Sequence, residues 1–181
     1  SAKLTVGITA AWVERNGDYI PFPEKYPDEA DVLKDGLDEG LLEIANHGLT
    51  HCVVRKHLPR AFSSNRRFHR EFWDWIPRED HFAHLEQSQE ILQSYFETEI
   101  TTLIPPGNVI SQDTVDAAKE NGIKRINCLT DQSSNGEVSI IGNEYIIDFH
   151  DREIVLEGVE WLFNKLELLS KDREFVFIKE L

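Results

Sequence analysis

Short apolar runs alternate with segments of helical periodicity along the chain, and this alternation constrains the fold more than any other feature. Strands that alternate with helices imply a mostly parallel sheet covered by helices. About six strand–helix units are visible, which is too few to close an ordinary eight-fold barrel. The expected strands are 4–10, 41–45, 123–129, 145–151, 174–178 and a short one that ends at 103–104, and the expected helices are 31–39, 78–97, 112–120 and 153–170.

Length and composition indicate one soluble globular domain over residues 1–181. The chain is 40% hydrophobic and 10% aromatic, so it can bury a sizeable core. A net charge of −14 disfavours nucleic acid and anionic membranes as partners, because their phosphates would be repelled. Cys52 and Cys128 cannot form a disulfide framework and are expected to be small buried apolar residues. No apolar run approaches membrane-spanning length, and a cytoplasmic location is expected.

Two histidines follow the apolar run Leu41–Ala45, in the stretch Asn-His-Gly-Leu-Thr-His at 46–51. His47 and His51 are four residues apart, a spacing that points both imidazoles the same way on one helical turn. Neutral imidazole is a common metal ligand, so the pair could serve a single ion. Spacing alone does not decide this, because seven histidines give such a pair by chance in about one sequence in four. The alternative is a pair of solvated loop histidines.

Two other segments place candidate substrate-binding or catalytic residues at the ends of expected strands. A double proline ends one strand and stiffens the turn 105–108, in which Gly107 allows a close backbone approach. Asn108 is either a donor to a substrate or a simple turn-forming residue. His150 ends the expected strand 145–151 and is either structural or catalytic. Active sites of barrel-like α/β folds are built at the carboxyl ends of the strands.

Residues 52–77 are expected to form a long loop within the domain, rich in arginine and aromatic residues. Aromatic rings stack on pyranose faces and arginine pairs with phosphate or carboxylate, so Arg70 and Trp73 are candidates for binding a sugar-phosphate or anionic glycan. The alternative is that the aromatic residues anchor the loop to the core while the arginines are solvated. His81 and His84, on the helix that follows, are expected to lie on its surface.

The stretch Glu-Ile-Ala-Asn-His-Gly-Leu-Thr-His at 43–51 resembles the second motif of the polysaccharide deacetylases, which are carbohydrate esterase family 4 and carry the NodB-homology domain. That motif is H-[S/T]-x-x-H, and His47 and His51 fall on its two metal-binding histidines. Gly48 stands where the family has Ser or Thr, a departure found among divergent members.

Later segments resemble further motifs of the same family. Pro105 and Gly107 match the third motif, R-x-P-x-G, but Leu103 replaces its arginine. His150 resembles the histidine of the fifth motif, which ends an apolar strand, and Asp131 lies roughly where the fourth motif has an aspartate. The opening motif of the family, Phe/Tyr-Asp-Asp, has no counterpart ahead of the histidine pair.

The resemblance implies a distorted seven-stranded (β/α) barrel, similar to a TIM barrel, whose first strand is missing from an N-terminally shortened chain. The implied activity is metal-dependent hydrolysis of an N-acyl group on a sugar or polysaccharide, in surface-polysaccharide biosynthesis, with a carbohydrate or glycolipid as substrate. A divalent metal such as Zn²⁺ would bind His47 and His51, and His150 would protonate the leaving amine. The residues expected to contact substrate are Pro106, Gly107, Asn108, Trp73 and Arg70.

In the family, the third metal ligand and the general base are the two aspartates of the opening motif. The resemblance therefore implies that this chain alone is inactive or nearly so. Two other functions stay open. One is a non-catalytic carbohydrate-binding relative with the same fold, and the other is a metal-dependent amidohydrolase that acts on a non-sugar amide.

Overall fold

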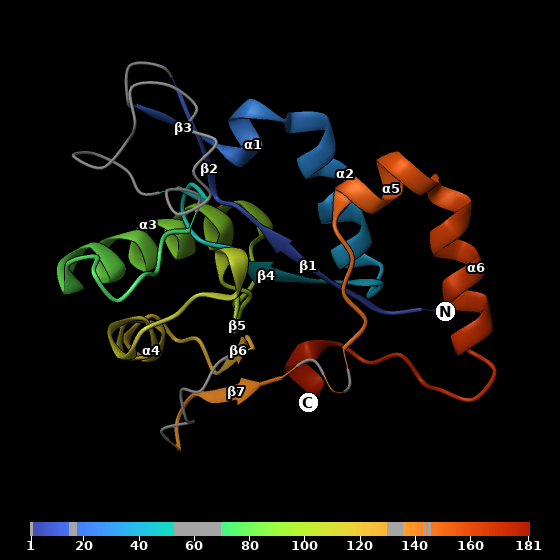
Figure 1. Cartoon of the computed structure of the whole chain (residues 1–181). Helices are drawn as coiled ribbons and strands as arrows, with labels where there is room; N and C mark the ends of the chain where they lie inside the picture. Colours follow the sequence, from blue (N-terminus) through green and yellow to red (C-terminus); the bar gives the residue numbers. More distant parts are fainter. Residues whose placement is uncertain (1, 15–17, 53–69, 130–135, 143, 145) are drawn as a thin grey trace.

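A computed structural model describes residues 2–14, 18–52, 70–129, 136–142, 144 and 146–181. Its centre is a five-stranded sheet in the order β1-β4-β5-β6-β7, in which every neighbouring pair is parallel (Figure 1). The parallel α/β architecture predicted from the alternation is therefore confirmed. The strands are β1 (Leu4–Ile8), β4 (Leu42–Asn46), β5 (Thr102–Leu103), β6 (Arg125–Asn127) and β7 (Ser139–Ile141).

β1 and β7 are the edges of this sheet, because each pairs with one neighbour in the described part of the chain. Closure into the expected barrel is not seen among these residues. A separate antiparallel hairpin, β2 (Ala11–Val13) and β3 (Tyr19–Pro21), follows β1 directly. It brings the segment after β1 back toward the carboxyl end of the sheet, since Ala10 and Ala11 donate backbone hydrogen bonds to Gly48 and Leu49.

The predicted helices 78–97 and 112–120 are confirmed. α3 (Arg78–Phe96) begins after Pro77, and α4 (Gln112–Glu120) begins after Ser111, whose hydroxyl accepts a hydrogen bond from the Thr114 amide. α3 and α4 pack side by side (Figure 1). The remaining helices are α1 (Phe22–Lys25), α2 (Pro27–Asp38), α5 (Asp151–Glu157), α6 (Val159–Leu169) and the 3₁₀ turns η3 (Pro106–Asn108) and η5 (Ile178–Glu180). None of the helices in the described ranges is long and apolar enough to cross a membrane.

α3 lies between two hydrophobic clusters that fill the core. One cluster contains Phe72, Leu85 and Leu103, and the other contains Leu92 and Phe96, all almost fully buried. Because α3 also packs against α4, His81 and His84 are buried, at 0% and 4% exposure, and the prediction that they lie on the helix surface is wrong. The His81 Nδ1 atom lies 3.0 Å from the Thr114 hydroxyl of α4.

Three predictions for the last third of the chain are wrong. The expected strand 145–151 is not formed: residues 146–150 are in no strand, and β7 lies earlier in the chain. The expected strand 174–178 is an irregular segment that leads into η5. The expected helix 153–170 is two helices, separated at Gly158. An apolar β-prone run becomes a strand only where a neighbouring strand can pair with it, and the sequence does not contain that information.

Candidate functional site

The histidine pair lies immediately after β4, at the carboxyl end of the sheet. Asn46 ends the strand and is fully buried. Its side-chain amide donates to Ser88 Oγ at 2.7 Å and to Gln89 Oε1 at 3.2 Å on α3, while its Oδ1 accepts from the Gly48 amide at 2.8 Å. Asn46 therefore turns the chain out of the sheet into a tight turn, in which His51 adopts a left-handed conformation at φ 58°.

His47 is held by both its backbone and its ring. Its amide donates to Ile8 on β1, and its Nδ1 atom lies 2.5 Å from the Ile104 carbonyl oxygen. A carbonyl oxygen can only accept, so Nδ1 carries the proton and Nε2 keeps its lone pair. A backbone carbonyl on the other ring nitrogen is the common arrangement for a metal-binding histidine.

Loss of hydration lowers the pKa of the His47 imidazole to about 4, and repulsion from His51 adds to this effect. The hydrogen bond to Ile104 and attraction to Glu71 act in the opposite direction, and a smaller repulsion from His150 lowers the pKa further. His47 is therefore neutral at neutral pH, the protonation state in which imidazole binds a metal.

The two imidazoles lie close enough to share one ion. Their ring centroids are 5.0 Å apart, with an angle of 55° between the ring planes. With Zn–N bonds of about 2.0–2.1 Å and tetrahedral angles, two rings on one zinc ion have centroids roughly 5 Å apart. The two imidazoles could therefore occupy two of the coordination positions of one metal ion. No cluster of three or more His, Cys, Asp or Glu side chains that could hold a metal occurs among the residues the structure describes.

Glu71 lies under the histidine turn and is 0% exposed. Its Oε1 atom accepts hydrogen bonds from the Thr50 amide at 2.9 Å and the Thr50 hydroxyl at 3.3 Å, and it lies 3.4 Å from His84 Nδ1. The turn is therefore supported by a buried carboxylate from the segment that precedes α3. The sequence gives no spacing rule that links these residues, so Glu71 was not predicted and His84 was wrongly expected on the helix surface.

The Pro-Pro-Gly turn packs against the histidine turn, and Arg70 lies on it. A Cβ atom built at Gly48 would lie 3.2 Å from Pro106 Cγ, and one built at Gly107 would lie 2.5 Å from Arg70 Nε. The Arg70 guanidinium is 5.5 Å from the ring centroid of Trp73, a cation–π distance. The structure thus brings together four of the five residues predicted to contact substrate, and the fifth, Asn108, is exposed on the same turn with φ 54°.

Leu103, which stands where the related motif has an arginine, is fully buried in the core. The Arg70 guanidinium lies against Gly107 of the Pro-Pro-Gly turn, 2.5 Å from the position that a Cβ atom at Gly107 would take. An arginine from a different part of the chain therefore lies beside the Pro-Pro-Gly turn, although the matching position in the motif carries leucine.

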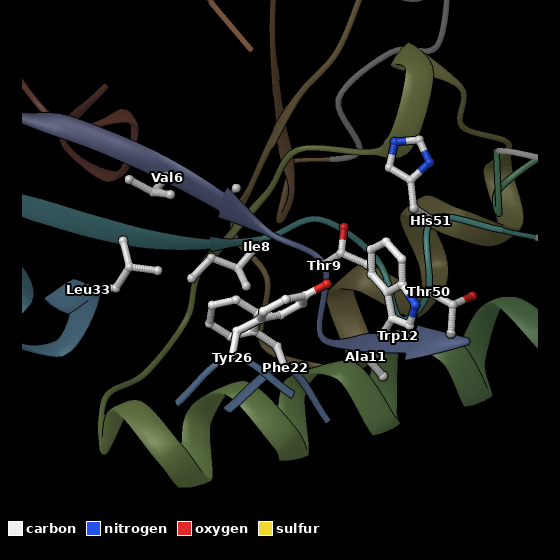
Figure 2. Close-up of a pocket in the computed structure, with 11 residues that line it drawn as sticks. Val6, Ile8, Thr9, Ala11, Trp12, Phe22, Tyr26, Leu33, Thr50 and His51 are labelled. Atoms are coloured by element: carbon white, nitrogen blue, oxygen red, sulfur yellow. The ribbon is translucent and has the colours of Figure 1, made fainter. Parts of the chain in front are cut away.

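A cavity of about 430 Å³ opens beside His51 (Figure 2). His51 and Thr50 lie on one side of it and Val6 and Leu33 on the opposite side, with aromatic rings between them. Those rings belong to Trp12 of the hairpin, Phe22 of α1 and Tyr26, which directly follows α1. Trp12 is 47% exposed, so an aromatic face remains open to solvent. This wall was not predicted from the sequence, in which the only signal was the presence of these three aromatic residues between the first strand and the helix α2.

His150 lies immediately before α5 rather than at the end of a strand. Its backbone amide donates to Glu153 Oε2 at 2.7 Å, its Nδ1 atom lies 3.5 Å from the same oxygen, and its side chain is 75% exposed. Asp131 and residues 53–69 of the predicted loop lie outside the described residues. Cys128 is buried as expected, whereas Cys52 is half-buried.

Several solved structures are similar to this chain, and two of them, with TM-scores above 0.5, share its fold. A 4-alpha-glucanotransferase from Thermococcus litoralis is 16% identical, with 99% of this chain and 31% of that chain covered and a TM-score of 0.60. A family 4 acetyl xylan esterase from Clostridium thermocellum, solved with a cobalt ion, is 12% identical, with 99% and 76% covered and a TM-score of 0.52. A de-N-acetylase from Aggregatibacter actinomycetemcomitans is 17% identical, with 62% and 46% covered and a TM-score of 0.42.

The chain spans less than half the length of the glucanotransferase and of the de-N-acetylase. No curated protein matches it. The sequence model of the polysaccharide deacetylases, in contrast, matches residues 1–126, which include β1, β4, the histidine turn and the Pro-Pro-Gly turn. This chain therefore belongs to the polysaccharide deacetylase family.

Proposed function

We propose that the protein is a metal-dependent hydrolase that removes an N-acyl group from a sugar or polysaccharide, with His47 and His51 as two ligands of a divalent ion such as Zn²⁺. The observation that carries this proposal is the geometry of the pair: ring centroids 5.0 Å apart, and a His47 ring whose Nδ1 faces the Ile104 carbonyl, so that Nε2 is free to bind. The family supplies the reaction class, and a relative with the same fold was solved with cobalt.

Each residue at the site has a distinct part in this reaction. When bound, the ion would polarise the acyl carbonyl and lower the pKa of a water molecule. His47 and His51 would hold that ion. His150, as imidazolium, gives its proton to the departing amine, and its high exposure allows it to exchange protons with solvent. Arg70 and Trp73 offer a cation and a ring face to the sugar.

The third ligand and the general base are not found among the described residues. Two imidazoles alone bind zinc more weakly than the three protein ligands of a catalytic site. A site with these two ligands alone is thus expected to bind metal weakly and to turn over slowly, and full activity is proposed where carboxylates complete the site.

A non-catalytic carbohydrate-binding function is the second candidate. The buried Leu103 in place of the motif's arginine favours it, as does the incomplete ligand set in the described part of the chain. Under this alternative the aromatic wall of the cavity and the Arg70–Trp73 pair retain a sugar without cleaving it.

Replacement of His150 by alanine separates the two functions. Loss of a general acid typically lowers turnover by about 10²- to 10⁴-fold, so His150→Ala is expected to stop acetate release from N-acetylglucosamine oligomers incubated with Zn²⁺. Acetate release is measured over long incubations, and oligomer binding is measured in parallel by calorimetry. Metal-dependent binding without acetate release by the unmodified protein would support the binding function. Equal release by His150→Ala and the unmodified protein would contradict the role of His150.

A further inference from the structure

Glu71 is a buried carboxylate that the proposed reaction does not yet use. A carboxylate without exposure is costly unless it is paired and hydrogen-bonded. Glu71 Oε1 accepts hydrogen bonds from the amide and hydroxyl of Thr50, and His84 Nδ1 lies 3.4 Å away without forming a hydrogen bond among the described residues. Glu71 Oε2 has no hydrogen-bond partner in the part of the chain that the structure describes. The hydrogen bonds of this carboxylate in the described part of the chain therefore come from one turn, the one that carries the histidine pair.

Glu71 also accounts for the residue at position 48. Gly48 is buried with φ 80°, and a Cβ atom built there would lie 1.9 Å from Glu71 Oε2 and 3.1 Å from Glu71 Cδ. The carboxylate thus occupies the space that any side chain at this position would need. The resembling motif carries Ser or Thr at this position, and either side chain would clash with the Glu71 carboxylate in this structure.

His84 completes the arrangement from the other side. It is 4% exposed on α3, and its Nδ1 atom faces Glu71 Oε1 at 3.4 Å. α3 is anchored in both hydrophobic clusters, so this contact ties the turn to a rigid part of the core. Thr50 donates both hydrogen bonds to the Glu71 carboxylate. It lies between His47 and His51 in the sequence, one residue before His51.

We propose that Glu71, oriented by His84, is a positioning residue that fixes the turn from His47 to His51 and thereby the relative placement of the two imidazoles. The inference rests on the proposed function only in so far as the imidazoles serve as metal ligands. Outer-shell partners of this kind typically change metal affinity by about 10- to 100-fold when they are replaced.

Glu43 provides a matched control for Glu71. It is the other buried glutamate of this sheet region, 3% exposed, and it accepts hydrogen bonds from the Thr5 hydroxyl, the Thr102 hydroxyl and the Lys179 amide. Three residues of β4, 44–46, lie between it and His47, and the four residue steps span roughly 13 Å along a strand. Glu43→Gln therefore perturbs a buried carboxylate network without touching the histidine turn.

The test measures the histidine rings before any metal is added. Long-range ¹H–¹⁵N spectra report the ring nitrogens of His47 and His51 in the unmodified protein, Glu71→Gln and Glu43→Gln. We expect Glu71→Gln to shift the ring signals of both histidines and to weaken Co²⁺ binding by about 10- to 100-fold. We expect Glu43→Gln to leave both unchanged. Ring signals that stay in place in Glu71→Gln, or that move equally in Glu43→Gln, would overturn the proposal.

A second variant keeps the test decisive if Glu71→Gln does not fold. His84→Gln removes the imidazole that orients the carboxylate but leaves Glu71 and the turn intact, so it is expected to shift the His51 ring signals in the same direction by a smaller amount. Unchanged His51 signals in that variant would count against the proposal. Failure of the unmodified protein to bind Co²⁺ would contradict the proposed function alone, because the ring spectra still report on Glu71.

Discussion

Gly48→Ala is expected to lower the free energy of unfolding by about 3 kcal/mol or more. A non-glycine residue in the left-handed region costs about 1–2 kcal/mol, and the φ of Gly48 is 80°. The new Cβ atom would also lie 1.9 Å from Glu71 Oε2, so the buried carboxylate must move away from Thr50 and lose its hydrogen bonds. Leaving a buried charged group without its partners costs more than the 1–3 kcal/mol typical of neutral groups. Urea denaturation measures the difference.

Gly40→Ala separates backbone strain from the clash with Glu71. Gly40 has φ 69°, close to that of Gly48, but a Cβ atom built there meets nothing within 4 Å. Its replacement is therefore expected to cost only the strain, about 1–2 kcal/mol. If Gly48→Ala proves no more destabilising than Gly40→Ala, the carboxylate does not fill the space at position 48 and the description of the turn is wrong.

Phe72→Ala is expected to lower the free energy of unfolding by about 3–5 kcal/mol, the range typical of a large aromatic residue removed from a core. Phe72 is 0% exposed and packs in the cluster that contains Leu85 and Leu103. Because it directly follows Glu71, its loss should also loosen the carboxylate under the histidine turn. Thermal or urea unfolding measures the stability, and the histidine ring spectra measure the second effect.

Trp73→Ala is the matched control for Phe72→Ala, one residue along the chain. Trp73 is half-buried and stacks with Arg70 rather than packing in the core. Its replacement is expected to cost less than about 2 kcal/mol but to weaken binding of an N-acetylglucosamine oligomer. Equal destabilisation by the two variants would mean that Phe72 does not anchor this segment, and unchanged oligomer binding in Trp73→Ala would remove Trp73 from the substrate surface.

The parts of the fold that the sequence predicted well are those with local signals. α3 starts after Pro77 and α4 starts at the Ser111 cap, and both helices formed within one residue of the expected bounds. β4 was located within one residue because its apolar run is buried on both faces. The expected strand 145–151 failed because its pairing depends on a distant neighbour rather than on its own residues.

The candidate site was predictable only where its residues are close in sequence. The spacing of His47 and His51 on one turn is such a case, and so is the turn at Pro106 and Gly107. Glu71 is 20 residues beyond His51 and reaches the turn only because Phe72 and α3 fix its position, so no periodicity could have identified it. The same holds for the aromatic wall, which the hairpin and α1 deliver beside His51.

The central claim is that one divalent ion binds His47 and His51 together. Calorimetric titration of the unmodified protein with Zn²⁺, alongside His51→Ala and His150→Ala, tests it most directly. Replacement of an outer-shell partner costs about 10- to 100-fold in affinity, so loss of the ligand in His51→Ala should cost at least about 100-fold, while His150→Ala should bind as the unmodified protein does. Zinc affinity that is the same with and without the His51 imidazole would contradict the account.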